Sequence, residues 1–367
     1  MRIGVPRERA AHERRVALVP DVVARLVKSR HEVTVERDAG RAAGFPDAHY
    51  AAAGARIADD PTQVLGGSDL LLKVQRPSRE EAALVAERSI LISFLAPSSS
   101  QDVLAVLADR KVTALAMELV PRISRAQAMD ALSSQANLAG YKAVVIGAEA
   151  MNRVLPMMTT AAGTLAPAKA FVVGAGVAGL QAIATARRLG ALVSAFDVRP
   201  VVREQVQSLG ASFVEAPVAA EGAGGYAKEL AAEQQQRVAE AIAKHIVSQD
   251  LVVTTAQVPG RPAPRLVAAG MVRSMRPGSV IVDLAAETGG NCELTRAGEV
   301  VEEGGVIVLG PVNVPSTVAF HASQTYSRNL QALLQHLLDA DGVPKLDLAD
   351  EITGAMVVTH AGENRNG

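Results

Sequence analysis

The sequence predicts an α/β protein built from two doubly wound parallel-sheet domains that are joined by two long helices. Three observations lead to this fold class. Short apolar runs alternate with helical stretches along the whole chain, a pattern typical of parallel strands connected by crossover helices. The 367 residues are enough for two domains, each with its own hydrophobic core. One long helical stretch separates two series of apolar runs, and another follows the second series.

The two series of apolar runs are the expected strands of the two sheets. The first series lies near Arg2–Val5, Glu32–Glu36, Leu70–Val74, Ile90–Phe94 and Val112–Met117. The second series lies near Phe171–Val173, Leu192–Phe196, Ser212–Val214, Leu251–Thr255, Val280–Leu284 and Val306–Leu309. In doubly wound sheets a ligand lies beyond the carboxyl ends of the strands, so we expect the binding site in the cleft between the two domains.

The expected long helices set the domain boundaries. Leu132–Val154 leads from the first series of strands to the second, and Ser316–Leu338 leads back. We therefore expect residues 1–135 together with about 320–367 to form one domain, and residues 136–319 to form the other. The polar tail His360–Gly367 is expected to be disordered.

The most informative motif is a glycine-rich turn after the strand Ala170–Val173. The turn consists of Gly174, Ala175, Gly176, Val177, Ala178 and Gly179. In such a turn the first glycine permits the bend, the second leaves room for a pyrophosphate, and the third lets the next helix pack close to the strand. Unpaired N–H groups at the start of that helix favour negative charge. The motif predicts a Rossmann-like dinucleotide site, and a glycine turn without a ligand is the alternative.

An acidic residue ends the next strand of this series. Asp197 lies 18 residues beyond Gly179, near the spacing of a carboxylate that accepts a hydrogen bond from a ribose 2′-hydroxyl. Such a carboxylate would repel the 2′-phosphate of NADP, so the sequence favours NAD. Arg199 weakens this preference, and Val198 is expected beside the cofactor as well.

Two further segments are expected near the dinucleotide. Gln257 follows the strand Leu251–Thr255 at the carboxyl edge of the sheet, where cofactor contacts are expected. Residues 215–236 are rich in Ala and Gly and contain Gly225 and Tyr226, and a helix is expected at Glu229–Ile246. This segment is either a flexible surface insertion or a mobile lid with Tyr226 at its tip.

Composition excludes several other classes of function. A formal net charge of −1 with 3% aromatic residues and no Trp gives no basis for nucleic-acid binding. The one cysteine, Cys292, allows no internal disulfide and fits a reducing compartment. The charged N-terminus is unlike a signal peptide, and no transmembrane segment is expected. The seven histidines are scattered, so no metal site is predicted.

Three further segments carry a resemblance to a known family over almost the whole chain. They are Gly4–Glu8 with Glu13–Pro20, then Pro121–Gln135, and then Asp283–Asn291. Together with the glycine turn, they resemble the family shared by alanine dehydrogenase and the NAD(H)-binding component, domain I, of proton-translocating transhydrogenase. The segment Pro121–Gln135 is specific to the transhydrogenase branch.

In that branch, this segment forms a loop that holds the nicotinamide end of NAD(H). The resemblance implies that the contact residues are Arg122, Gln127, Asp130, Leu132 and Ser133. Arg122, Gln127, Asp130 and Ser133 are also the residues implied to position the nicotinamide for hydride transfer. A guanidinium that donates and an amide that donates and accepts suit this role. The resemblance further implies that Tyr226 closes over the cofactor. The alternative for the loop is an ordinary helix N-terminus capped by Asp130 and Ser133.

The alanine dehydrogenase branch needs an Arg and a Lys for its substrate and a His and an Asp to complete its site. Arg15 and Lys73 stand at the matching positions, but Ala96 replaces the His and Glu287 replaces the Asp. Alanine cannot transfer a proton, so oxidative deamination is disfavoured. We expect Arg15 and Lys73 to be structural ion-pair partners, for instance of Glu8 or Glu118.

The resemblance implies a homodimer that binds NAD(H) and transfers hydride directly between NADH and NADP⁺. NADP(H) would be bound on a partner component, domain III, and a membrane domain would translocate the proton. The protein would then be cytoplasmic and peripheral on the inner face of the bacterial plasma membrane. A direct transfer of this kind needs positioning groups and no general base, in keeping with the absence of His from Pro121 to Gln135. An alanine dehydrogenase-like oxidoreductase and a non-catalytic NAD-binding module are the alternatives.

Overall fold

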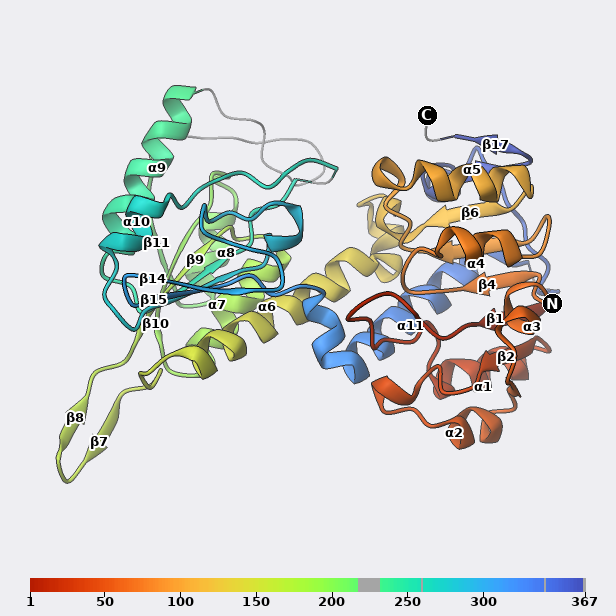
Figure 1. Ribbon diagram of the computed structural model, residues 1–367, viewed down its shortest axis with the longest axis horizontal. Helices are drawn as coiled ribbons and strands as arrows, with labels where there is room; N and C mark the ends of the chain where they lie inside the picture. The colour runs from red at the N-terminus through yellow and green to blue at the C-terminus, as the bar shows by residue number, and fades with distance from the viewer. Residues whose placement is uncertain (217–231, 259, 340, 366–367) are drawn as a thin grey trace. The chain divides into compact units, whose positions relative to one another are not determined.

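The computed structural model describes residues 1–216, 232–258, 260–339 and 341–365. The chain divides into two compact units, each of which is described by itself (Figure 1). Unit 1 contains Met1–Gln135 and Pro315–Gly367, and unit 2 contains Ala136–Val314. The helix α6 (Ala131–Ala150) carries the chain from unit 1 into unit 2, and α11 (Ala319–Leu337) begins soon after the chain returns to unit 1.

Unit 1 is built around an eight-stranded sheet with the order β17-β16-β6-β5-β4-β1-β2-β3. Its strands are β1 (Arg2–Val5), β2 (Glu32–Glu36), β3 (Arg56–Ala58), β4 (Leu70–Leu72), β5 (Ile90–Ser93), β6 (Thr113–Ala116), β16 (Val357–His360) and β17 (Glu363–Asn364). The first six pair in parallel, and β16 joins β6 in antiparallel fashion. Because β1 lies between β2 and β4, the sheet has a switch point at which ligands bind in doubly wound folds.

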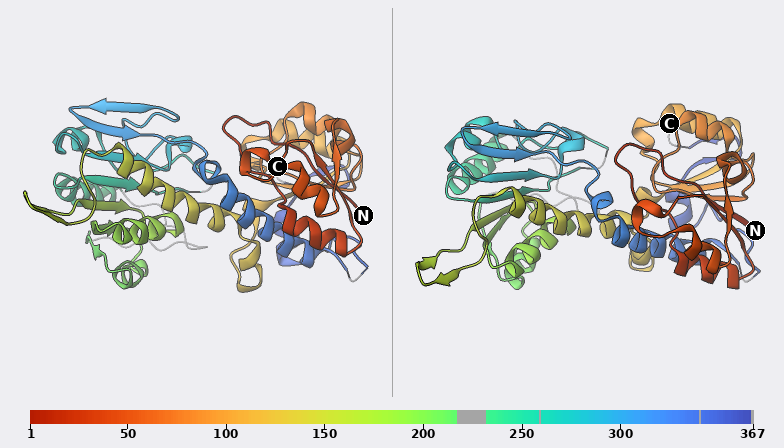
Figure 2. Two further views of the ribbon diagram at one scale, coloured as in Figure 1. Left: turned by 90° about the horizontal axis from the view of Figure 1, so that it is seen from below. Right: turned by 60° about the horizontal axis from the view of Figure 1, so that its bottom comes forward.

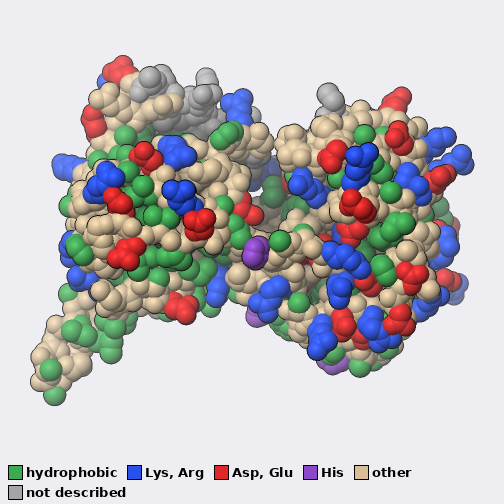
Figure 3. All heavy atoms as spheres, viewed as in Figure 1, with side chains coloured by type: hydrophobic (Ala, Val, Ile, Leu, Met, Phe, Trp, Pro, Cys, Tyr) green, Lys and Arg blue, Asp and Glu red, His purple; other side chains and the backbone are tan. Residues whose placement is uncertain are grey.

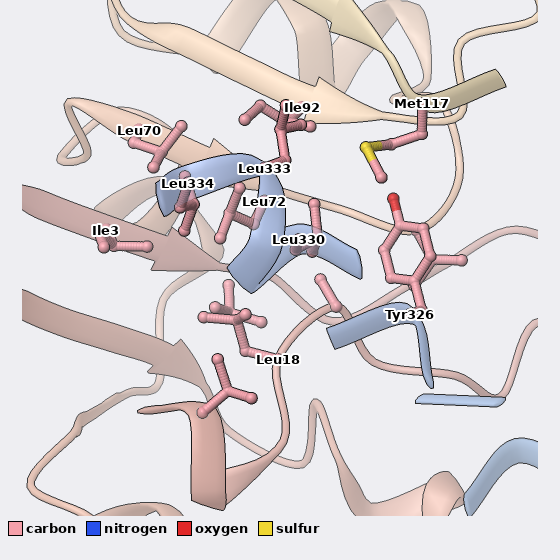
Figure 4. Packing of buried hydrophobic residues seen from close by; sticks show 14 of the residues in the cluster. Ile3, Leu18, Leu70, Leu72, Ile92, Met117, Tyr326, Leu330, Leu333 and Leu334 are labelled. Atoms are coloured by element: carbon pink, nitrogen blue, oxygen red, sulfur yellow. The ribbon is translucent and has the colours of Figure 1, made fainter. Parts of the chain in front are cut away.

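Two apolar layers cover the faces of this sheet. Its helices are α1 (Pro20–Lys28), α2 (Asp47–Ala52), α3 (Pro61–Leu65), α4 (Arg79–Leu84), α5 (Gln101–Asp109), α11 and α12 (Glu351–Met356). Leu70 and Leu72 face one layer and Leu71 the other, as the alternation of side chains along a strand requires. Figure 4 shows Leu330 and Leu334 of α11 in the first layer.

Unit 2 contains a seven-stranded sheet with the order β11-β10-β9-β12-β13-β15-β14. Its strands are β9 (Lys169–Val173), β10 (Leu192–Phe196), β11 (Ser212–Phe213), β12 (Leu251–Thr254), β13 (Val280–Asp283), β14 (Val300–Glu303) and β15 (Val306–Leu309). Its helices besides α6 are α7 (Val177–Arg188), α8 (Val202–Ser208), α9 (Ala232–Ile246) and α10 (Ala269–Ser274). All strands pair in parallel except the edge strand β14. The predicted fold class is confirmed.

Local sequence explains where the helices begin. Ser78 accepts a hydrogen bond from the N–H of Glu81, whose side chain in turn accepts one from the N–H of Ser78, so α4 begins with a capping box. Asp60 caps α3, and Pro20 at the first position of α1 lacks the N–H that a helix start cannot use. The sequence signals for these helices are therefore local and strong.

A hairpin of β7 (Met158–Thr160) and β8 (Gly163–Leu165) forms a separate two-stranded sheet in unit 2. Every residue of both strands is exposed, and the hairpin extends away from the seven-stranded sheet in each view (Figures 1 and 2). In Figure 3, this hairpin carries hydrophobic side chains, whereas basic and acidic side chains are interspersed over the rest of the face that is seen.

Two expectations need correction, one about the C-terminal tail and one about where the first long helix ends. The sequence predicts a disordered tail from His360, but β17 pairs with β16, and Asn364 Nδ2 donates to Gln101 Oε1 at 2.8 Å. Backbone and side-chain hydrogen bonds therefore order the tail as far as Arg365, whose N–H donates to the carbonyl of Val358. The first long helix also ends at Ala150, four residues before the expected Val154.

Candidate functional site

The glycine turn of unit 2 joins β9 to α7 in the geometry of a phosphate-binding turn. Gly174 has a φ of 97°, and a Cβ there would come within 2.7 Å of Thr255 Oγ1. A Cβ on Gly179 would overlap the carbonyl oxygen of Gly174. By contrast, the nearest heavy atom to a Cβ on Gly176 would be Arg199 Nη2 at 4.0 Å. Packing therefore requires glycine at 174 and 179, while the described residues leave space in front of Gly176 for a ligand.

The start of α7 carries backbone donors next to this space. No side chain caps the helix at Gly176, Val177 is exposed, and Ala178 is half-buried. The first N–H groups of a helix have no partner within the helix, and its dipole favours an anion. The turn and α7 together have the chemistry that a pyrophosphate needs.

Two polar residues that the sequence analysis did not single out hold this edge of the sheet together. Thr255 Oγ1 donates to the carbonyl of Gly174 at 2.9 Å, which ties the glycine turn to the end of β12. The buried Asn291 accepts from the N–H of Ala256 and donates to the carbonyl of Ala256. Polar residues directly after a buried strand are the signal that would have identified Thr255.

Asp197 accepts hydrogen bonds from Ala175 and Arg199, both within the described part of the chain. Its Oδ1 accepts from the backbone N–H and Nε of Arg199, both at 2.9 Å. Its Oδ2 accepts from the N–H of Ala175 at 2.7 Å and from Arg199 Nη2 at 2.8 Å. A carboxylate has about four acceptor positions, so these bonds saturate it. The hydrogen bond to Asp197 raises the pKa of the Arg199 guanidinium.

The Asp197–Arg199 pair bears directly on the predicted ribose contact. Asp197 must release a bond to Arg199 before it can accept from a ribose hydroxyl, so that role stays a prediction. Val198 is partly buried against the core of unit 2. Gln257 is exposed, and its Nε2 donates to the carbonyl of Leu284 at 2.9 Å. Gly225 and Tyr226 lie outside the described residues.

The predicted nicotinamide loop, Pro121–Gln135, lies in unit 1 and contains the 3₁₀ helix η4 (Ser124–Met129) and the start of α6. Arg122 and Gln127 are exposed, and Leu132 is half-buried. Asp130 accepts from the N–H of Ser133 at 2.9 Å and from Ser133 Oγ at 2.6 Å, which caps α6. The capping interpretation and the binding interpretation of Asp130 and Ser133 are compatible, because both use the same start of a helix.

Arg15 is buried in unit 1, and its charge is compensated within the protein. Its Nη2 forms an ion pair with Glu13 Oε2 at 2.7 Å, and its Nε donates to Glu13 Oε1 at 2.8 Å. Its Nη1 donates to Gln135 Oε1 at 2.9 Å. The guanidinium fork that would hold a substrate carboxylate is thus directed to Glu13 and Gln135.

Lys73 is also buried in unit 1, and carboxylates of the same chain compensate its charge. Its Nζ lies 3.4 Å from Glu8 Oε2 and 3.4 Å from Glu81 Oε2, and the side chain is 1% exposed. Glu8 is one of the two partners that we named for Arg15 and Lys73, and burial raises its pKa. Two carboxylates therefore surround the one ammonium, which leaves little positive field for a substrate carboxylate.

Ala96 and Glu287 stand where the alanine dehydrogenase branch has its His and Asp, and both take part in hydrogen bonds within this chain. Ala96 has a φ of 47°, and the half-buried Glu118 accepts hydrogen bonds from the N–H groups of Leu95 and Ala96. Burial raises the pKa of Glu118. Glu287 is exposed in unit 2 and accepts from the N–H of Asn313 at 3.1 Å. In the described part of the chain, no group of three His, Cys, Asp or Glu residues is arranged to hold a metal ion.

Comparison with models of known protein families shows to which family this chain belongs. The model of the alanine dehydrogenase/PNT N-terminal domain matches residues 4–139, and that of the C-terminal domain matches residues 143–367. The chain belongs to the alanine dehydrogenase/PNT family. The two matches together cover nearly the whole of both units.

Within the alanine dehydrogenase/PNT family, transhydrogenase subunits are among the similar proteins. The first part of NAD(P) transhydrogenase subunit alpha of Rhodospirillum rubrum is 49% identical over 99% of this chain and 97% of its own length. Alanine dehydrogenase of Methanococcus maripaludis is 31% identical over 87% of this chain and 82% of its own length. The crystal structure of transhydrogenase from Sinorhizobium meliloti matches with a TM-score of 0.90, at 46% identity over 99% of this chain and all of that one.

Among the helices in the described ranges, none is both long enough and apolar enough to span a membrane.

Proposed function

We propose that this protein is the NAD(H)-binding component of a proton-translocating NAD(P) transhydrogenase. The observation that carries the proposal is the internal compensation of Arg15 and Lys73 by Glu13, Glu8 and Glu81. An alanine dehydrogenase would need these two cations for its substrate. The 49% identity to a transhydrogenase subunit supports the same choice.

The residues of unit 2 fit the adenosine and pyrophosphate part of NAD(H). Open space in front of Gly176 and the uncapped start of α7 suit the pyrophosphate. Thr255 and Asp197 hold the turn in place through the carbonyl of Gly174 and the N–H of Ala175. Arg199, whose guanidinium lies near Gly176, adds positive charge beside the expected phosphates.

The loop of unit 1 suits the nicotinamide part. When bound, NADH supplies a hydride with its electron pair, and NADP⁺ accepts it to become NADPH. No proton is released, so the protein must orient the donor and exclude water rather than act as a base. Arg122 and Gln127 offer exposed donors and an acceptor for this purpose, and the Asp130–Ser133 cap fixes the helix start beside them.

Binding of NADP(H) and movement of the proton are the work of partner components. NADP(H) binds to domain III of the transhydrogenase, and a membrane domain moves the proton. This chain acts as a homodimer on the cytoplasmic face of the bacterial plasma membrane, attached through the complex. Gly225 and Tyr226 belong to a loop that closes over the cofactor, and Gln257 contacts the cofactor at the carboxyl edge of β12.

The deciding experiment mixes the purified protein with an NADP(H)-binding domain III loaded with NADPH and adds the acetyl-pyridine analogue of NAD⁺. We expect stopped-flow absorbance to show reduction of the analogue only when both proteins are present. A parallel reaction with alanine and NAD⁺, and its reverse with pyruvate, ammonia and NADH, should show no turnover.

Each alternative predicts a different outcome. Turnover of alanine would identify an amino-acid dehydrogenase and overturn the proposal. Binding of NADH without any transfer to the second nucleotide would identify a non-catalytic NAD-binding module. A titration of NADH binding by fluorescence, run on the same samples, separates the second outcome from a protein that has lost its fold.

A further inference from the structure

One buried side-chain amide of α11 forms hydrogen bonds to the predicted nicotinamide loop. Asn329 is 7% exposed and lies in the middle of this helix. Its Nδ2 donates to the carbonyl of Ala128 at 2.8 Å, and its Oδ1 accepts from Ser134 Oγ at 2.7 Å. Asn329, Ala128 and Ser134 are not among the expected contact residues, and Asn329 lies far from the loop in sequence.

The orientation of the amide follows from its partners. A backbone carbonyl can only accept, so the NH₂ group of Asn329 must face Ala128. The carbonyl oxygen of the amide then faces Ser134, whose hydroxyl can donate. Both halves of the amide are used, and an aliphatic side chain would leave the carbonyl of Ala128 without this partner.

The two hydrogen bonds of Asn329 go to residues that precede and follow Asp130 in the sequence. Ala128 directly follows Gln127 in η4, and Ser134 directly follows Ser133 in α6. Asn329 therefore ties the segment that carries Gln127 to the helix start that carries Ser133. A second tether, between Arg125 Nη1 and Asp350 Oδ2 at 2.9 Å, holds the other end of η4. The first tether is the one that fixes the spacing across Asp130.

We infer that Asn329 is a positioning residue that sets the geometry of Gln127 relative to Ser133, and thereby the rate of hydride transfer. This inference rests on the proposed function. Asn329 itself touches no reacting atom in this account; it acts through the loop. Small displacements of a bound donor cost large factors in rate, whereas binding is spread over the whole dinucleotide. The expected effect therefore falls mainly on the transfer step.

The test uses Asn329→Asp, which has nearly the same shape. When protonated, the introduced carboxyl can donate to the carbonyl of Ala128 and accept from Ser134, as the amide does. When ionised, it has no proton to donate, and its oxygen faces the carbonyl oxygen of Ala128. The charged or titratable groups on the packed elements include Asp130 in the loop, Arg125 in η4, Asp350 at the N-cap of α12, and Arg328 and His336 in α11.

The measurement is the transfer rate with domain III, taken as the ratio of variant to wild type from weakly acidic to weakly alkaline pH. We expect a ratio near one at low pH and a fall of about tenfold or more as the introduced carboxyl ionises. NADH affinity should change far less. Ser327→Ala is the matched control, because Ser327 on the same helix accepts from the N–H of Val19, outside the loop.

Each possible outcome of these measurements supports or contradicts the inference. A ratio that does not vary with pH, or an equal loss in Ser327→Ala, would overturn the inference. If Asn329→Asp does not fold, Ser134→Ala removes one of the two bonds and should lower the rate without lowering NADH affinity; an unchanged rate there would contradict the inference. If the wild type transfers no hydride, the proposed function fails. Hydrogen exchange of residues 124–134 then still tests the tether, which predicts faster exchange in Asn329→Asp at high pH.

Discussion

At the scale of single residues, charge compensation separates the two branches of the family. Arg15 and Lys73 stand where the resemblance implies substrate-binding cations in alanine dehydrogenase, but each is buried against carboxylates of this chain. Removing one partner of a buried pair costs about 3–5 kcal/mol, because the other charge is left uncompensated. A substrate carboxylate that displaced Glu13 or Glu8 would meet the same cost. These cations are therefore committed to their internal partners in unit 1.

Asp197 and Arg199 form the residue pair on which cofactor choice depends. The Asp197→Ala substitution removes the carboxylate that would repel a 2′-phosphate and releases the Arg199 guanidinium from its partner. We expect NADH to bind about tenfold more weakly, because the N–H of Ala175 in the turn also loses its acceptor. The preference for NADH over NADPH should fall, as measured by the ratio of the two dissociation constants in fluorescence titrations.

The double variant Asp197→Ala/Arg199→Ala is the control for this prediction. It lacks both charges, so it should bind NADPH less well than Asp197→Ala does. An unchanged ratio of dissociation constants in Asp197→Ala would remove Asp197 from the account of selectivity. The sequence indicated both residues but not their pairing, since the path of the backbone after β10 decides whether residues two apart can share several hydrogen bonds.

At the scale of elements, the glycine turn shows how one motif combines packing with binding. Gly179 lets α7 approach β9, and Gly176 leaves space for a ligand. We expect Gly179→Ala to lower the free energy of unfolding by about 1–3 kcal/mol, because its Cβ would overlap the carbonyl of Gly174. Chemical denaturation followed by circular dichroism measures this loss.

The matched variant in the same turn is Gly176→Ala. Its backbone φ of −76° suits alanine, and the new Cβ meets no atom of the described residues closer than 4.0 Å. The free energy of unfolding should therefore change by less than about 1 kcal/mol. NADH affinity should fall strongly, since the methyl group occupies the expected pyrophosphate space. Equal effects of the two substitutions on stability would contradict this division of roles.

Burial separates most of the strands that the sequence analysis predicted from most of those that it missed. Predicted strands such as β9 and β12 are almost wholly buried and read as continuous apolar runs. Among the missed strands, β14 alternates exposed and half-buried residues, and β7 and β8 are fully exposed, whereas β16 is largely buried. Their pairing depends on neighbours rather than on their own composition. The tether at Asn329 was missed for the same reason, because it joins segments distant in sequence.

At the scale of the whole molecule, the candidate contact residues are divided between the two units. The glycine turn, Asp197 and Gln257 belong to unit 2, whereas Arg122, Gln127 and Ser133 belong to unit 1. Each unit has its own sheet and its own apolar layers, so each can hold its residues in place independently. The proposed function requires one dinucleotide to contact both sets.

This requirement can be tested with two ligands of different length. NADH should slow hydrogen–deuterium exchange at residues 174–180 in unit 2 and at residues 127–134 in unit 1, because bound ligand stabilises the segments that it contacts. ADP lacks the nicotinamide half and should protect only the segment in unit 2. Mass spectrometry of peptides from both segments, at matched saturation of the two ligands, gives the comparison. Protection confined to unit 2 with NADH as well as ADP would show that the loop of unit 1 does not hold the nicotinamide, and the assignment of Arg122 and Gln127 would have to be abandoned.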